Sequence, residues 1–101
     1  MPNLKEETLE AFKLIDKSIE DIESYDIRYG YLSYNIIARG EKEFNIDDLD
    51  LNYNSIRNDN IGFQEICGSI LFKDKTWLGR TRHMGEEMWS YSNKLYKPTF
   101  D

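Results

Sequence analysis

The stretch 68–91 constrains the fold of this 101-residue chain more than any other part. Runs of β-forming residues follow one another there and are separated by Lys73-Asp74-Lys75 and Gly85-Glu86-Glu87. Such short connections suit turns that join antiparallel neighbours. The pattern therefore predicts two β-hairpins in series, which form a three-stranded meander. The strands are expected at about 64–72, 76–84 and 88–96.

The beginning of the chain predicts one amphipathic helix over about residues 3–24. Asn3 is a suitable N-cap, and Glu6 follows three residues later, as in a capping box. Apolar residues then recur at spacings of three and four, which places one apolar stripe along the helix. The residues of this stripe are Leu9, Phe12, Ile15, Ile19 and Ile22.

Two more strands are expected between the helix and the meander. Residues 26–37 are rich in tyrosine and isoleucine, and residues 48–54 alternate apolar with polar side chains. A helix with one apolar stripe must cover an apolar surface such as one face of a sheet. We therefore expect a single α+β domain over residues 1–101, with the N-terminal helix packed on a mainly antiparallel sheet of about five strands.

The charge of the chain narrows the classes of partner. The net charge is −6, and residues 1–65 carry 15 acidic against 7 basic side chains, whereas residues 66–101 carry 4 against 6. Direct binding of nucleic acid is disfavoured because it needs a dominant basic surface. The carboxylates suit a basic partner or simply keep a small domain soluble. The polar N-terminus and the absence of a long apolar run lead us to expect a cytoplasmic protein without membrane contact.

The residues that could support catalysis or metal binding are few. The chain has one histidine, His83, and one cysteine, Cys67, which cannot make a zinc site by themselves. Residues 48–54 resemble the start of a calcium loop, but Tyr53 stands where that loop needs glycine. His83 could serve as a general base, although an ordinary hydrogen bond at a hairpin end is the simpler interpretation. We expect no enzyme, no catalytic residue, no metal and no cofactor.

The predicted meander offers one candidate binding surface. Alternation places Trp77 and His83 on one face of their strand, and Arg80 and Arg82 on the other. Aromatic and arginine side chains are typical of interface hot spots. The alternative is that the tryptophans cover the core, and we favour this for Trp77 and Trp89 while expecting both arginines to be exposed. The candidate partner-binding residues here are Arg80, Arg82, His83, Trp77 and Tyr91.

A second candidate binding surface consists of carboxylates. Asp47, Asp48 and Asp50 lie close together in the acidic part of the chain and would suit a basic channel in a partner. The other carboxylates considered for the same role are Glu10, Asp21, Glu41 and Glu43.

The second half of the chain also resembles a pattern in small uncharacterised proteins of phages and mobile elements. In that pattern an aspartate-glycine turn precedes a Trp-Leu strand, and an acidic-aromatic turn precedes paired tryptophans. Lys75, Arg82-His83-Met84 and Met88 depart from it. The matching residues are Leu49 to Tyr53, Gly68-Ser69-Ile70, Phe72, Asp74, Thr76-Trp77-Leu78, Arg80, Gly85, Glu87, Trp89 and Tyr91.

The resemblance implies a phage or mobile-element protein that acts in the host cytoplasm. In that setting we expect an inhibitor of a host protein, with an anti-defence, anti-CRISPR-like role as the leading hypothesis. It would block its target sterically or by charge, at a nucleic-acid-binding surface, without binding nucleic acid itself. A homodimer remains open. The alternatives are a toxin-immunity protein and a small-ligand or second-messenger module with a pocket of Trp77, Tyr91 and Arg80.

Overall fold

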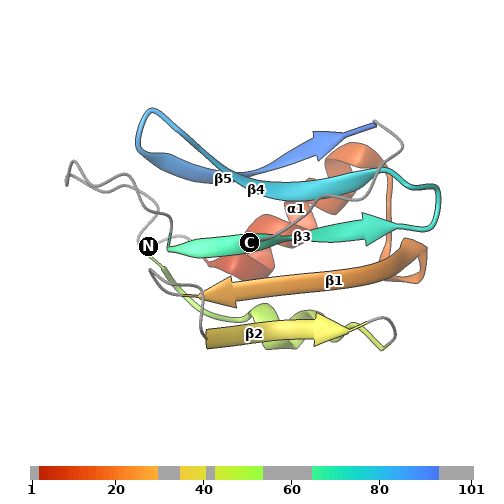
Figure 1. The fold of residues 1–101 in the computed structure, drawn as a ribbon, viewed down its shortest axis with the longest axis horizontal. Helices are drawn as coiled ribbons and strands as arrows, with labels where there is room; N and C mark the ends of the chain where they lie inside the picture. The colour runs from red at the N-terminus through yellow and green to blue at the C-terminus, as the bar shows by residue number, and fades with distance from the viewer. Residues whose placement is uncertain (1–2, 30–34, 41–42, 54–64, 94–101) are drawn as a thin grey trace.

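The computed structural model describes residues 3–29, 35–40, 43–53 and 65–93, and it confirms the expected fold class (Figure 1). One α-helix packs on one side of a five-stranded antiparallel sheet, which gives an α+β fold. No helix in these described ranges is long and apolar enough to cross a membrane. The elements are α1 (Leu4–Ile15), the 3-10 turn η1 (Ile19–Asp21), β1 (Ile22–Tyr29), β2 (Asn35–Gly40), the 3-10 turn η2 (Ile46–Leu49), β3 (Ile66–Phe72), β4 (Trp77–His83) and β5 (Glu86–Ser92).

The strand order in the sheet is β2-β1-β3-β4-β5, and neighbouring strands are antiparallel. β1 and β2 form one edge, β3 returns on the other side of β1, and β4 and β5 follow in sequence (Figure 1). The predicted double hairpin is therefore confirmed. β3 and β4 lie within their expected ranges, whereas β5 begins earlier than expected, at Glu86. Residues 64 and 94–96 of the expected strands lie outside the described residues.

Helix α1 begins where the sequence predicts it and ends earlier. The side chain of Asn3 accepts a hydrogen bond from the backbone N–H of Glu6 at 3.1 Å, which confirms the N-cap. The helix ends at Ile15 because Asp16 takes a left-handed conformation (φ 57°, ψ 47°) and closes the last turn. The expected boundary near residue 24 is wrong, since the chain has already entered β1 by then.

The buried stripe of α1 also differs from the predicted one. Leu4, Thr8 and Phe12 are buried at a regular spacing of four, whereas Leu9 is 44% exposed. Ile19 and Ile22 follow the helix in the chain and belong to η1 and β1. Phe12 and Ile15 do face the core as predicted, but the rest of the buried stripe lies on the N-terminal side of Phe12, at Thr8 and Leu4.

The predicted strands at 26–37 and 48–54 need correction. The first spans parts of two strands, β1 and β2, that pair antiparallel with Ile27 opposite Ala38. The second is not a strand: η2 occupies residues 46–49, and only Asn52 makes a β-bridge, with Asn3. Leu49 and Tyr53 are nevertheless buried in the core, at 0% and 1% exposure, although neither belongs to a strand. Residue 54 lies outside the described residues.

The hydrophobic core lies between α1 and the sheet. Alternate residues of the inner strands point towards the helix, while their neighbours, such as Ser24, Asp26 and Arg28 of β1, point to the opposite face. The ring of Phe12 meets that of Phe72 edge-on at 5.8 Å between centroids. The buried core side chains include Leu4, Phe12, Ile27, Leu49, Tyr53, Ile66, Ile70, Phe72 and Leu78.

Gly68 lies very close to the backbone of β1, and we expect its replacement to cause a large loss of stability. Its φ is +135°, and an added Cβ would lie 2.1 Å from the backbone oxygen of Asp26 on β1. We expect Gly68→Ala to lower the free energy of unfolding by at least about 2 kcal/mol, because strain and a backbone clash combine. Urea denaturation measures this loss.

Gly79 supplies the matched control for this substitution. A Cβ at Gly79 would meet the ring of Trp77 at 2.5 Å, and that half-buried side chain can turn aside. We expect Gly79→Ala to cost clearly less than Gly68→Ala, at about 1 kcal/mol. Equal losses for the two variants would contradict the role of the β1–β3 approach.

Candidate functional site

Arg80 lies on the helix side of β4 and is buried, contrary to the expected exposure. The exposed fraction of its side chain is 0%. Its guanidinium donates to Glu7 Oε1 at 2.5 Å and to the hydroxyl of Tyr53 at 2.9 Å, and lies 3.9 Å from Glu87 Oε1. A buried charge persists only when opposite charges and hydrogen bonds compensate its loss of hydration. These contacts compensate the two Nη groups, while the buried Nε has no hydrogen-bond partner among the described residues.

The partners of Arg80 are themselves bonded to further parts of the fold. Glu87 is 3% exposed and accepts the backbone N–H groups of Glu65 and Ile66, both at 2.7 Å. The Tyr53 hydroxyl donates to Glu7. The expectation that Glu87 belongs to a solvated turn is therefore wrong: the turn is at Met84-Gly85, and Glu87 lies within β5.

Trp89 completes this group of residues. Its ring lies 4.9 Å from the Arg80 guanidinium, within the range of a cation–π interaction. Its Nε1 donates to Thr8 Oγ1 at 2.9 Å, which ties β5 to α1. The expectation that Trp89 covers the core is confirmed. We call Arg80, Glu7, Tyr53, Glu87 and Trp89 the Arg80 cluster.

The other residues of the predicted meander surface are divided between the two faces of the sheet. The expectation that Trp77 covers the core under the helix is wrong, because it lies on the opposite face, half-buried, with its ring over Gly79. His83 is exposed at the end of β4, opposite Glu86. Arg82 is half-buried and Tyr91 is 42% exposed, both on the helix side of the sheet. The expected pocket of Trp77, Tyr91 and Arg80 does not form, because Trp77 points away from the other two.

The predicted acidic residues Asp47, Asp48 and Asp50 are brought together by η2, and all three are exposed. Asp47 pairs with Lys5 at 2.6 Å, and this hydrogen bond raises the pKa of the lysine. Asp50 accepts a hydrogen bond from the side chain of Asn3 at 2.9 Å. We call these three residues the η2 carboxylates. They lie against the first turns of α1, so the helix and η2 present their negative charges together.

A groove runs between α1 and the edge strand β5 and encloses about 330 Å³. Four glutamates are among its lining residues, Glu7 and Glu10 from the helix and Glu86 and Glu87 from the strand, and none of the described lysines or arginines lines it. We call this the β5 groove. Its apolar residues are Ala11, Leu14, Met88 and Trp89.

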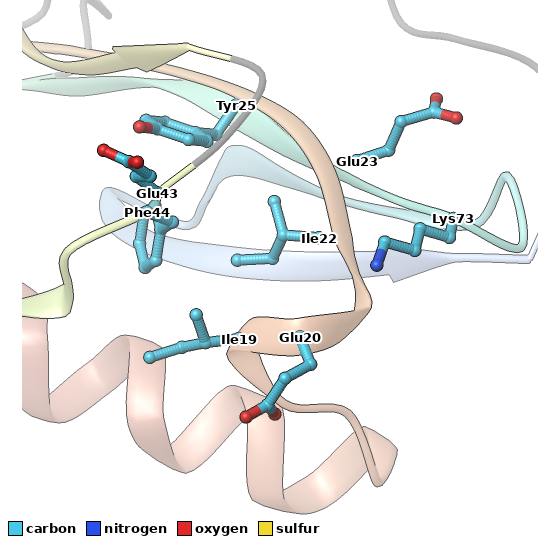
Figure 2. Close-up of a pocket in the computed structure, with 8 residues that line it drawn as sticks. All are labelled: Ile19, Glu20, Ile22, Glu23, Tyr25, Glu43, Phe44 and Lys73. Carbon is cyan, nitrogen blue, oxygen red and sulfur yellow. The ribbon is translucent and has the colours of Figure 1, made fainter.

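A second hollow, of about 550 Å³, lies beside the start of β1 (Figure 2). Ile19, Ile22 and Phe44 form its apolar part, and the ring of Tyr25 meets that of Phe44 edge-on at 4.8 Å. Glu23 turns away from these apolar side chains and pairs with a residue outside the hollow, Lys75. The remaining charged side chains are Glu20, Glu43 and Lys73, so the hollow carries both signs of charge.

Comparisons with protein-family models, with curated proteins and with solved structures found no match. The geometry of the described residues is therefore the basis for the choice of site. Because the side chain of Arg80 is fully buried, it cannot contact a partner directly. The η2 carboxylates and the β5 groove remain as the negatively charged candidate surfaces.

The partners of Arg80 could have been found from one signal in the sequence. Arg80 shares the alternation of Leu78, which faces the core, and an arginine in an inward position requires a nearby carboxylate. Glu87 and Glu7 were available for that role. The β5 groove had no such signal, because the residues that line it come from opposite ends of the chain.

We expect replacement of Arg80 to cause a much larger loss of stability than replacement of an exposed arginine. Arg80→Ala leaves Glu87 buried without its cation, so we expect the free energy of unfolding to fall by about 3–5 kcal/mol. Arg39→Ala removes a pair with Asp26 at 3.7 Å from an exposed side chain and should cost less than about 1 kcal/mol. Chemical denaturation of both variants checks this, and similar small losses would contradict the burial of Arg80.

The buried hydroxyl of Tyr53 predicts a loss of stability at alkaline pH. Burial, and then the hydrogen bond to Glu7, raise the pKa of Tyr53 well above its ordinary value of 10.0. A raised pKa contributes stability that is present below pH 10 and is lost above it, where the unfolded chain ionises and the folded one does not.

Between pH 10 and 12 the wild type should therefore lose up to about 1.4 kcal/mol per pH unit more than Tyr53→Phe does. Urea denaturation at several pH values measures the two slopes. Parallel slopes for the two proteins would show that Tyr53 ionises normally in the folded state.

Proposed function

We propose that this chain is a small binding protein that inhibits a host protein by presenting carboxylates to a basic surface. The leading target is the nucleic-acid-binding surface of a defence complex such as a CRISPR effector. The phage or mobile-element setting comes from the resemblance of the meander. The mode of action comes from the distribution of charge.

One observation carries the proposal: the cations of the described residues are largely used inside the molecule. Their ion pairs reduce the positive field at the surface, and the fold keeps the net charge of −6 that the sequence has. Exposed carboxylates such as Glu10, Asp48 and Glu86 form no ion pair within the described residues. The paired cations are Lys5, Lys17, Arg28, Arg39, Lys75 and Arg80.

The burial of Arg80 also favours one of the two binding modes that the sequence left open. Docking through Arg80 and Arg82 needs both guanidinium groups at the surface, and Arg80 is enclosed by its own carboxylates. The carboxylate mode needs no rearrangement, since the η2 carboxylates are already exposed. Such a surface would compete with phosphates for the lysines and arginines of the target.

A second candidate function is favoured by the hollow of Figure 2. Its volume of about 550 Å³ lies within the range of roughly 300–1,000 Å³ that small-molecule sites occupy. A small-ligand module would show a ligand that raises the melting temperature in a screen of nucleotides and metabolites. A toxin-immunity protein would use the same acidic surface as the inhibitor, against a toxin encoded beside it.

Charge reversal at the η2 carboxylates tests the proposed inhibition. The probe is inhibition of DNA binding by a purified CRISPR effector from the host, at two salt concentrations. We expect the triple variant Asp47→Lys, Asp48→Lys, Asp50→Lys to lose at least tenfold in potency, and the wild type to weaken steeply as salt rises.

Lys13→Glu is the control, because it changes an exposed cation in the opposite direction and should not weaken inhibition. Circular dichroism of each variant verifies folding. Potency that is unaffected by the triple reversal and by salt, or the absence of inhibition, would contradict the proposed function.

A further inference from the structure

Strand β5 is an edge of the sheet that no described strand covers. It pairs with β4 along Glu86–Ser92, and its other side is the end of the strand order (Figure 1). An uncovered edge is a template for an added strand, which would pair through its main chain. Natural edges are commonly protected by lysine, proline or a bulge. The register of β5 against β4 contains no bulge, and its sequence contains neither lysine nor proline.

The β5 groove lies directly beside this edge. A strand added to β5 would point every second side chain to the side of Trp89 and α1. There it would meet Leu14, which is 77% exposed, and the part of Trp89 that is not covered by the core. These apolar surfaces suit the aliphatic stems of long side chains.

The charge of the groove determines which side chains fit. Glu7 and Glu87 are held by the Arg80 cluster, whereas Glu10 and Glu86 are exposed and make no ion pair within the described residues. Glu10 lies on the helix side of the edge, whereas Glu86, which pairs with His83 at the beginning of β5, points to the opposite face. A cation on either face of an added strand would therefore find a carboxylate nearby. An acidic or neutral segment would gain no such pairing.

We propose that β5 and the β5 groove bind an extended segment of the target that is rich in arginine or lysine. The segment adds as a sixth strand. Its side chains on the helix side cover Leu14 and Trp89 with their stems and bring their cations to Glu10, and a cation on its opposite face reaches Glu86. This inference rests on the proposed function, because it names the element of the basic partner that the protein holds. It differs from a purely electrostatic contact in requiring the main chain of the partner.

Three synthetic peptides of eight residues test the proposal on the full chain: alternating arginine and valine, alternating glutamate and valine, and the arginine-valine sequence with every backbone amide N-methylated. The third keeps the charge but has no backbone N–H to donate to β5. We expect the arginine-valine peptide to shift the backbone amide NMR signals of residues 86–92 and of α1 around Leu14. The other two should bind at least tenfold more weakly.

Matched charge variants locate the site. Glu10→Lys with Glu86→Lys should weaken binding of the arginine-valine peptide at least tenfold, and Glu6→Lys with Glu20→Lys, which changes the net charge equally, less than threefold. The proposal is overturned if the N-methylated peptide binds equally well, if both double variants lose equally, or if β5 amides do not respond. It is also overturned if sedimentation shows a dimer of this chain and dilution shifts the β5 amide signals, because a second copy then occupies the edge.

The outcomes separate this inference from the proposed function. If inhibition depends on the η2 carboxylates and β5 does not respond to the peptide, the proposed peptide site is rejected and the proposed inhibitor function stands. If the peptide adds to β5 and no effector is inhibited, the proposed peptide site stands and the proposed inhibitor function is rejected.

Discussion

The buried ion pair between Arg80 and Glu7 is the interaction on which the arrangement of helix and sheet depends. A guanidinium without water needs acceptors at fixed positions, and here they come from α1 and from the segment that follows η2. Glu87 adds a second negative charge 3.9 Å from the guanidinium, while it accepts the N–H groups of Glu65 and of Ile66 at the start of β3. The cluster thus specifies where the helix lies along β4 and β5, which apolar packing alone would specify less sharply.

The Arg80 cluster also affects the charge of the surface that a partner would meet. Because Arg80 is enclosed, the strand that looked most basic in the sequence contributes little positive charge to the surface. Other cations are paired with nearby carboxylates, as Lys17 is with Asp74, whose pKa is lowered by that hydrogen bond. The remaining exposed charge is mostly carboxylate, at η2 and in the β5 groove. A negative surface of this kind attracts basic partners and repels nucleic acid.

The fold class and the meander could be predicted because their signals are local. Alternation, turn residues and the Asn3 cap act within a few residues of the chain, and the structure follows them. The end of α1 could not be predicted from periodicity, because Ile19 and Ile22 continue the spacing into a strand that follows a left-handed Asp16. Leu49 and Tyr53 fit the alternation of a strand for a different reason, since both are buried outside any strand, Leu49 at the end of η2 and Tyr53 after it.

The candidate site was less predictable than the fold because it joins distant parts of the chain. Arg80 was identified as notable, but its role depends on Glu7, which lies 73 residues away. The η2 carboxylates were found as a cluster because they are neighbours in sequence. The β5 groove combines residues 7–14 with residues 86–89, and only the packing of α1 against the edge strand brings them together.

The guanidinium NMR signals of Arg80 test the central claim most directly. If Arg80 is held by Glu7 and Tyr53, its Nη protons should give resolved signals that exchange slowly with water and show nuclear Overhauser effects to the ring of Trp89. The exposed Arg39 in the same sample provides the comparison. Nη signals of Arg80 that average and exchange as fast as those of Arg39 would contradict the buried cluster and the charge distribution derived from it.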